Sequence, residues 1–348
     1  MIKTNILNNK LLLISKLEKI IYTKTISVYL METRKIQVTG KSTYIMTLPK
    51  KWATRSNLYA GSQVKLNLQD NGALLITPNS ISEEKGKKIL HLNGDIQRFK
   101  RDLIATYILG NHDIVEVRSD HIPKETYNEV VDFCHDFVGL EIIDSNETCL
   151  IIQDLLDGDE FTLEKGLQRM FAITSTMIDD LAYALKVNDR DTIEYVIIRN
   201  TDTDRMHMLI SKQFIDRLRL NKISDYDHLN LIQAFYYRLA GDQIKHIAQH
   251  TAKIASYIMR KPIDKEKLTI INKFLIQSNS YLRRSYEAFK YINKEEANNI
   301  LKEYNEQIDT IDHLHEEGIP INIPLDSIKR INAYAANLSE LTIDLSQL

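Results

Sequence analysis

The chain contains few glycines, prolines and cysteines for its length. Among 348 residues there are 11 Gly, 6 Pro and 2 Cys. Two cysteines exclude a disulfide scaffold or a Cys-rich zinc module, and they fit a reducing compartment. So few helix-breaking residues predict long uninterrupted elements, mostly helices. The sequence also lacks a run of ~18 uncharged apolar residues, so we expect no membrane insertion.

Charge is distributed unevenly along the chain. The net charge is -2, yet residues 1–80 contain 12 Lys and Arg against 3 Asp and Glu, which leaves -11 for residues 81–348. A length of 348 residues predicts two or three domains. A basic N-terminal region on an acidic remainder indicates a polyanionic partner for that region alone. The alternative is a solvated, lysine-rich surface.

The first patterned segment covers residues 31–80, called the head below. Residues 1–30 are interpreted as a lead-in or tail, and both Met1 and Met31 stay open as the true start. In the head, alternating polar and apolar residues predict strands over 33–38 and 42–48 around Gly40. Pro49 is expected at the first position of a short basic helix over 50–57. Strands are expected over 63–68 and 73–77.

This order of elements resembles the AbrB/SpoVT family of swapped-hairpin DNA-binding domains. The resemblance rests on Arg34-Lys35-Ile36-Gln37-Val38, Gly40, Ser42-Thr43, Leu48-Pro49-Lys50-Lys51-Trp52 and Gly61-Ser62-Gln63-Val64. It implies that two protomers interleave their hairpins in one β-barrel, and hence a homodimer. A domain this small buries little core alone, which makes interleaving physically sensible.

Basic residues of the head are the candidates for binding double-stranded DNA. They would neutralise backbone phosphates, and an arginine among them can also bind a guanine edge. The alternatives are solubilising surface charges and a head that only dimerises. The candidates are Arg34, Lys35, Lys41, Lys50, Lys51 and Arg55.

Residues 86–156 predict a small α/β unit. Strands are expected over 87–92, 113–118, 140–145 and 148–153, with helices over 95–109 and 123–137. The unit has no Gly-rich loop after a strand, so nucleotide binding through such a loop is not expected. Cys134 and His135 are adjacent on the second helix and point about 100° apart, so they cannot form a nucleophile pair. A buried cysteine is the preferred interpretation.

The remaining residues predict only helices. Apolar residues at three- and four-residue steps begin near Phe161. Three helices are followed by three more, which indicates an internal repeat over 160–262 and 263–348. Each repeat is expected to form an antiparallel three-helix bundle. The expected helices are 161–185, 189–220, 227–259, 264–291, 294–316 and 326–346.

The third helices of the two repeats align with each other at an offset of 91. Arg238, Asp242 and His246 of the first correspond to Lys329, Ala333 and Asn337 of the second. Both segments resemble the third-helix signature of PhoU proteins, and residues 199–209 resemble the acidic second helix of archaeal PhoU-like proteins. An AbrB-like head fused to a PhoU-like body is an archaeal arrangement, and the resemblance implies regulation of phosphate uptake.

The PhoU resemblance also implies metal binding, but this chain departs from the family's acidic motif. Arg238 replaces the first acid, and the second repeat has lost both acids. A polar seam nevertheless appears on the first repeat's second and third helices. Asp and His from facing helices are ligands for Zn or Fe. The candidate ligands of a divalent metal are Asp204, His207, Asp242 and His246, and a buried polar network is the alternative.

The sequence thus predicts a multidomain protein: a swapped-hairpin β-barrel, a small α/β unit, and an all-α PhoU-like pair of three-helix bundles. No triad or phosphate loop is visible, so no enzyme is expected. The function expected is that of a cytoplasmic, dimeric, DNA-binding transcriptional regulator of phosphate uptake with a helical sensor or docking body. The alternative is a modulator that docks on a phosphate transporter or signalling protein while the head only dimerises.

Overall fold

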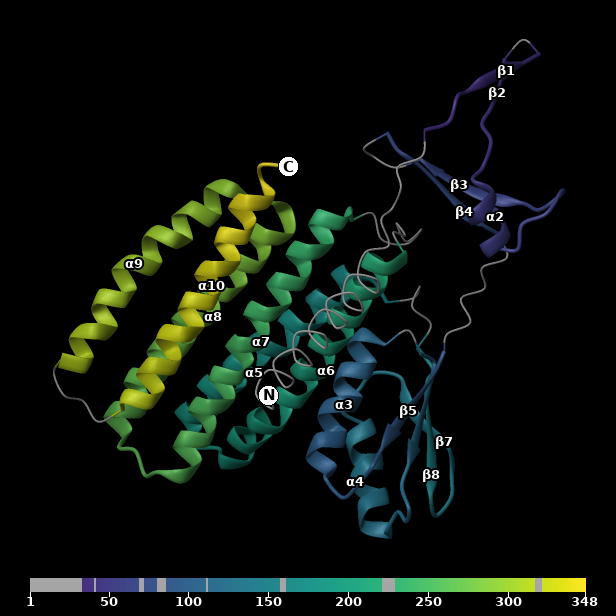
Figure 1. The fold of residues 1–348 in the computed structure, drawn as a ribbon. Coiled ribbons are helices and arrows are strands. Elements are labelled where there is room, and N and C mark those ends of the chain that lie inside the picture. Colours follow the sequence, from purple (N-terminus) through teal and green to yellow (C-terminus); the bar gives the residue numbers. More distant parts are fainter. Residues whose placement is uncertain are drawn as a thin grey trace, which may run out of the picture. The chain divides into compact units, whose positions relative to one another are not determined.

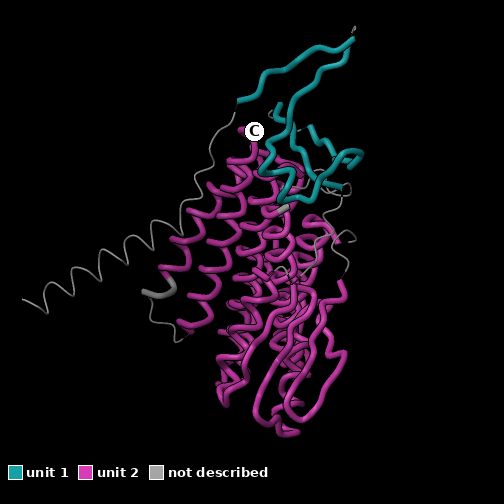
Figure 2. Tube along the Cα trace, turned by 45° about the vertical axis from the view of Figure 1, so that its right-hand side comes forward, with its two compact units in different colours: residues 1–84 teal, residues 85–348 magenta. Residues whose placement is uncertain are grey.

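The chain divides into two compact units, residues 1–84 and residues 85–348 (Figure 2). The interpreted lead-in, residues 1–30, and the DNA-binding candidate Lys41 lie outside the described residues. The computed structural model describes residues 33–40, 42–68, 72–79, 86–110, 112–156, 161–220, 229–316 and 321–348.

The head consists of two hairpins around a short helix. Strands β1 (Gln37–Thr39) and β2 (Thr43–Ile45) pair antiparallel, and β3 (Val64–Leu68) pairs antiparallel with β4 (Leu74–Pro78). Gly40 has a φ of 64°, the left-handed conformation that the predicted turn requires. Helix α2 (Lys50–Arg55) begins one residue after Pro49, which is its N-cap rather than its first residue. The predicted order β-β-α-β-β is confirmed, with shorter strands.

The two hairpins of one chain form separate two-stranded sheets. No closed barrel forms among the described residues of the head, because β1 and β2 do not pair with β3 and β4. The side chains of β1 and β2 are exposed throughout. Interleaving with a second protomer, which the sequence predicts, stays a prediction.

The second unit begins with a two-layer α/β segment. Its sheet has the order β5-β6-β8-β7, in which β5 and β6 are parallel and the other neighbours antiparallel. Helices α3 and α4 lie on one face of this sheet (Figure 1). The predicted order is confirmed, although α4 ends at Cys134 instead of Phe137. The elements are β5 (Lys87–His91), α3 (Ile96–Leu109), β6 (Ile114–Arg118), α4 (Lys124–Cys134), β7 (Leu140–Ser145) and β8 (Cys149–Asp154).

The core of this segment lies between the sheet and its helices. Phe99 and Leu103 of α3 face Val117 and Leu150 of the sheet, and all four are fully or almost fully buried. Cys134 belongs to the same core, and burial raises the pKa of its thiol to about 12. The thiol is therefore a buried core group, as the sequence predicts.

Six long helices make up the rest of the unit. Side chains cap several of their starts: Thr162 caps α5, Asn230 and Gln233 form a capping box on α7, and Asp264 caps α8. The helices match the predicted ranges within a few residues. They are α5 (Leu163–Val187), α6 (Arg190–Leu220), α7 (Leu231–Arg260), α8 (Lys265–Tyr291), α9 (Lys294–Glu316) and α10 (Asn322–Leu345).

The helices pack as two groups of three that share one core. Helices α5, α6 and α7 pack together, as do α8, α9 and α10, and the pairs α7–α10 and α5–α8 join the groups (Figure 1). The shared core includes Leu181, Ile247, Leu282 and Ile331. In the described part of the chain, no helix has the length and apolar character needed to cross a bilayer.

The α/β segment rests on helix α6. Met208 of α6 packs against the core of the α/β segment, and Lys212 of α6 forms an ion pair with Asp154 at the end of β8. Arg205 donates to the carbonyl oxygen of Phe137 at 3.5 Å. One face of α6 therefore packs against the α/β segment, and other faces of α6 pack against α5 and α7.

Candidate functional site

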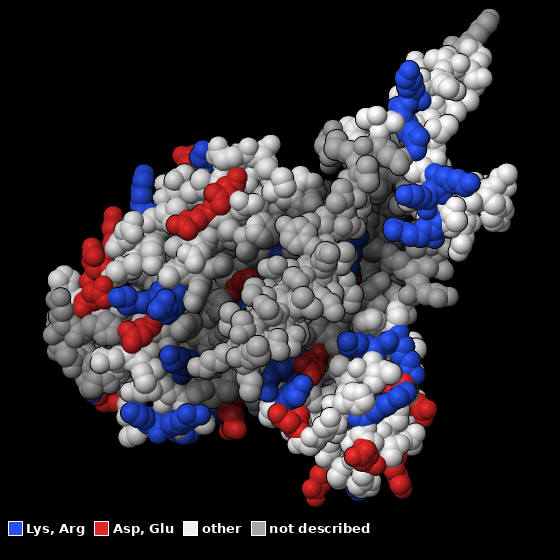
Figure 3. Space-filling model, viewed as in Figure 1, with Lys and Arg blue, Asp and Glu red and all other residues white. Residues whose placement is uncertain are grey.

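The first candidate site is the basic surface of the head. Five predicted DNA-binding residues are described, and all are exposed. The head's described residues, 33–40, 42–68 and 72–79, include six Lys and Arg and no Asp or Glu. Figure 3 shows this one-signed charge on the visible face of the head. The five described candidates are Arg34, Lys35, Lys50, Lys51 and Arg55.

Helix α2 presents three of these cations. Lys50 and Lys51 stand at its start and Arg55 in its last turn, while Trp52 between them is half-buried. None of the three cations forms an ion pair with a residue that the structure describes. An uncompensated cationic helix of this kind can neutralise phosphates without first breaking an internal salt bridge.

The head also exposes large apolar side chains. The relative exposure is 66% for Ile36, 74% for Tyr44, 62% for Leu66 and 72% for Leu68. Several large apolar side chains exposed on so small a domain are typical of a surface that becomes covered in an assembly. The sequence predicts this assembly as a homodimer.

The second candidate site is the polar seam between α6 and α7. His207 Nε2 lies 2.6 Å from Asp242 Oδ1, and the other carboxylate oxygen of Asp242 lies 2.6 Å from Arg238 Nη1. Because a carboxylate only accepts, His207 donates this hydrogen bond. Asp204 Oδ1 faces Lys245 Nζ at 3.5 Å, and its Oδ2 accepts from Asn200. The seam is thus a chain of paired charges.

Burial and pairing set the protonation of the central pair. Burial lowers the pKa of His207, reinforced by the cations Lys245 and Arg238, although the hydrogen bond to Asp242 opposes the shift. Burial raises the pKa of Asp242, but hydrogen bonds from His207 and Arg238 outweigh it and bring the pKa to about 2. The pair is therefore a neutral imidazole on a carboxylate.

The four predicted metal ligands do not converge. Only His207 and Asp242 are joined; His246 instead hydrogen-bonds Gln249 and stacks on Tyr334, with ring centroids 4.9 Å apart. Among the residues that the structure describes, no three His, Cys, Asp or Glu side chains are placed to hold one metal ion. Arg238 and Lys245 neutralise the two carboxylates instead. This geometry does not favour the metal site, which stays a prediction.

The sequence analysis did not predict that Arg238 and Lys245 form ion pairs with the two carboxylates of the seam. Arg238 and Asp242 are four residues apart on one helix, a spacing at which opposite charges meet, and this signal was available in the sequence. Lys245 reaches Asp204 across two helices, which the sequence does not encode locally.

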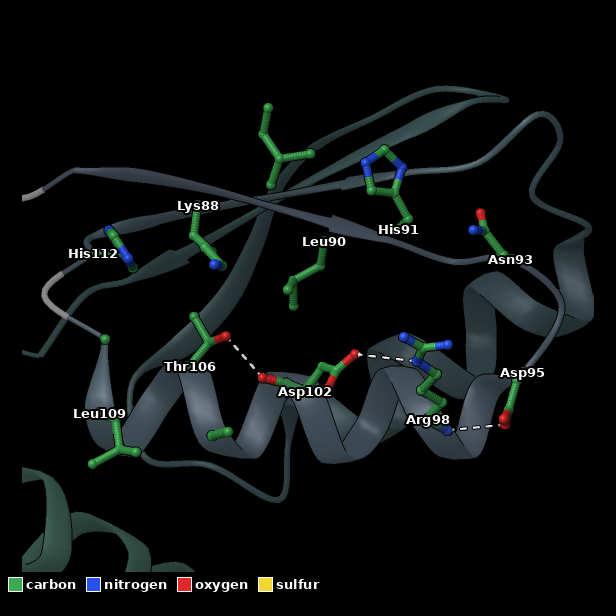
Figure 4. Close-up of a pocket in the computed structure, with 13 residues that line it drawn as sticks. Lys88, Leu90, His91, Asn93, Asp95, Arg98, Asp102, Thr106, Leu109 and His112 are labelled. Atoms are coloured by element: carbon green, nitrogen blue, oxygen red, sulfur yellow. Dashed lines mark hydrogen bonds and ion pairs between the residues drawn. The ribbon is translucent and has the colours of Figure 1, made fainter. Parts of the chain in front are cut away.

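A third hollow, of about 690 Å³, opens between β5 and α3 (Figure 4). Three of its charged side chains interact locally: Asp95 accepts from the backbone N–H of Arg98, and the Arg98 side chain pairs with Asp102 at 3.9 Å. His112 Nδ1 lies 3.1 Å from the carbonyl oxygen of Gly86. Because groups of both signs line this hollow, it does not favour a ligand of one charge.

Comparison with known families agrees with both sequence resemblances. Residues 167–258, from α5 to α7, match the family model of the PhoU domain. Residues 37–84 match the family model described as antidote-toxin recognition MazE, bacterial antitoxin. The chain therefore carries a PhoU domain in its helical body and a MazE/AbrB-like domain in its head, and helices α8–α10 lie outside the PhoU match.

Solved structures include similar helical proteins. PhoU from Pseudomonas aeruginosa is 16% identical, with a TM-score of 0.43, and the match covers 53% of this chain and 95% of that protein. The phosphate transport system regulatory protein PhoU from Streptococcus pneumoniae is 20% identical, with a TM-score of 0.43, covering 53% and 92%. A comparison with curated proteins gave no significant match.

Proposed function

We propose that this protein is a dimeric, cytoplasmic regulator of phosphate uptake that binds duplex DNA through its head. The observation that carries the proposal is the exposed cationic surface of a MazE/AbrB-like domain, free of acidic residues over its described part, on a chain that also carries a PhoU domain. The helical body acts as sensor or docking surface. The protein is proposed to regulate without catalysing a reaction.

The charge distribution supports DNA as the partner of the head. Duplex DNA carries dense negative charge, so cations gathered on one surface gain affinity by displacing its counterions. The body is net acidic by sequence and pairs many of its cations internally, as in Arg284 with Glu303 and Arg199 with Asp180. Repulsion between DNA and the acidic body leaves the head as the contacting surface.

Fluorescence anisotropy with a labelled duplex tests the proposal. The charge reversal Lys50→Glu, Lys51→Glu and Arg55→Glu should weaken binding by about 100-fold or more at low salt, because attraction becomes repulsion. A matched reversal of exposed lysines on the body, Lys186→Glu, Lys273→Glu and Lys302→Glu, should keep most of the affinity. Equal losses in the two triple variants would refute DNA binding by the head.

The exposed apolar residues of the head favour a second candidate function. Side chains such as Leu66 and Leu68 need a protein surface, not DNA, to become buried. In this alternative the head only dimerises, and the body docks on a phosphate transporter or signalling protein. Wild-type dimer that does not bind any duplex at low salt would select this alternative.

A further inference from the structure

A hollow of about 490 Å³ lies between α7, α9 and α10. It forms where α10 packs against both α7 and α9, two helices that do not pack closely on each other in the described part of the chain. Helix α7 contributes His250 and Lys253, α9 contributes Tyr304, and α10 contributes Asp326, Lys329 and Arg330.

Positive charge dominates the lining of this hollow. Lys253, Lys329 and Arg330 line it against one acid, Asp326. Lys329 Nζ is 2.5 Å from Asp312 Oδ1, so this cation is already paired. Lys253 and Arg330 are exposed and form no ion pair with any residue that the structure describes. Two cations from facing helices are therefore available to a ligand.

The internal repeat shows what has changed beside Lys329, which pairs with Asp312 of α9 instead of with a carboxylate of its own helix. Lys329 aligns with Arg238 and Ala333 aligns with Asp242, so the carboxylate that neutralises a cation within α7 has no counterpart within α10. Ala333 also lines the hollow. The place that holds a paired charge in the first repeat is open space beside cations in the second.

His250 of α7 adds a polar ring to the lining. Its Nδ1 atom is buried and, among the described residues, accepts or donates no hydrogen bond. Burial, together with the charges of Lys253, Arg330 and His246, lowers the pKa of His250 to about 4. A neutral imidazole with hydrogen on Nδ1 can donate a hydrogen bond to an anion.

We propose that this hollow binds a small ligand that carries more than one phosphoryl group, either pyrophosphate or a nucleoside polyphosphate. Arginine and lysine are the preferred donors to phosphate oxygens. A ligand with two or more phosphoryl groups offers acceptor oxygens to the cations of both helices at once, which a single phosphate does less well. A volume of about 490 Å³ also lies within the range of small-ligand sites. The idea that this ligand is the signal sensed by the body rests on the proposed function. The existence of the binding site does not depend on that function.

Isothermal titration calorimetry of the full chain tests the site, with pyrophosphate, ATP and orthophosphate as probes in chelator-treated buffer at constant ionic strength. Wild type should bind pyrophosphate or ATP with a Kd below about 100 μM. The variant Lys253→Gln, Arg330→Gln should bind at least about 10-fold more weakly, because two charge-assisted donors are lost. Both side chains are exposed, so the fold is retained, which circular dichroism verifies.

The matched control is Arg260→Gln, Lys273→Gln, which removes one Arg and one Lys of the same body at exposed positions away from the hollow. It should keep the wild-type affinity within about twofold. Binding of pyrophosphate and ATP alike supports recognition of the phosphate chain, and binding of ATP alone supports a nucleotide. Absence of binding at about 1 mM, equal losses in the two variants, or orthophosphate binding as tightly as pyrophosphate would overturn the proposal.

The two proposals fail independently. The head reversal Lys50→Glu, Lys51→Glu, Arg55→Glu should leave calorimetric binding of pyrophosphate or ATP unchanged, since the head is a separate compact unit. If the wild-type protein binds pyrophosphate or ATP but not DNA, the proposed function is refuted and the ligand site stands. If it binds DNA but neither ligand, the ligand site is refuted and the proposed function stands.

Discussion

The head and the helical body solve the same problem, burying apolar side chains, in opposite ways. Leu66 of the head is 62% exposed, whereas Leu282 of the body is completely buried. The body has long helices that cover one another within one chain, but the head offers only short hairpins and one helix. A segment of that size buries too little surface to be self-sufficient. This difference fits the proposal that a second protomer completes the head, whereas the described helices of the body cover one another.

The same contrast holds for charge. In the body, many cations lie against carboxylates, as in the seam pairs Arg238 with Asp242 and Lys245 with Asp204. In the head, the described residues include no carboxylate at all. Charges of one sign on one surface attract a polyanion, whereas paired charges do so much less. This difference fits the proposal that the head, and not the body, contacts DNA.

The largest effect is expected in the shared helical core. Leu282→Ala should lower the free energy of unfolding by about 2–5 kcal/mol, because it removes buried methyl groups and leaves a cavity. Leu66→Ala, the same change at an exposed site, should cost the body less than about 0.5 kcal/mol. Urea unfolding followed by helical circular dichroism measures both. Equal costs would show that the body is not self-contained.

Dimer formation should depend on the exposed residues of the head and not on those of the body. Leu66→Asp is expected to weaken the dimer by at least about tenfold, because a carboxylate would be buried at the interface. Ile198→Asp is the control: Ile198 is 61% exposed on α6, so the two sites match in exposure. Light scattering across a dilution series reports the mass. A wild type that runs at 40.4 kDa, the mass of one chain, would refute the dimer.

Acidification should lower the stability of the body more than that of the head, and this effect is expected to be the smallest of the three. His207 and His250 of the body have pKa values lowered below that of a free histidine, whereas residues 31–80 contain no histidine. As pH falls below about 6.5, these histidines become protonated in the unfolded chain but stay neutral in the folded body. The free energy of unfolding therefore decreases. For His250 this loss continues down to its pKa of about 4.

The melting temperature of the body should therefore fall between about pH 7 and about pH 5, with a smaller fall in His250→Gln. Asp242 does not contribute to this window, because its pKa of about 2 keeps it charged throughout. Calorimetric scans at several pH values provide the measurement. An unchanged pH dependence in His250→Gln would contradict the assignment of a neutral, buried imidazole.

Local patterns predicted most of the fold. Helix and strand ranges followed from periodicity, from caps such as Thr162, and from glycines such as Gly40, which adopts a positive φ. Strand ends in the head were placed too far out, because β1 and β2 stop pairing after three residues each. Docking of the α/β segment on α6 was not predictable, since Lys212 and Asp154 are distant in sequence.

The candidate sites were predictable only in part. A helical wheel places Asp204, His207 and Asp242 on facing surfaces, and the structure joins His207 to Asp242. A helical wheel does not show which cation of a neighbouring helix lies beside a given carboxylate. The ion pair between Lys245 and Asp204 was therefore not predicted. The hollow beside α10 was missed for the same reason, because it depends on how three helices from two repeats pack.

The salt dependence of DNA binding by the full chain tests most directly that the head is the contacting part. Affinity should fall steeply with salt, with a slope in log Kd of about 0.9 for each phosphate neutralised. In Lys50→Gln, Lys51→Gln, Arg55→Gln the slope should drop by about 2.7 for each protomer in contact, since three cations are lost. An equal slope in wild type and variant would contradict DNA binding by the head.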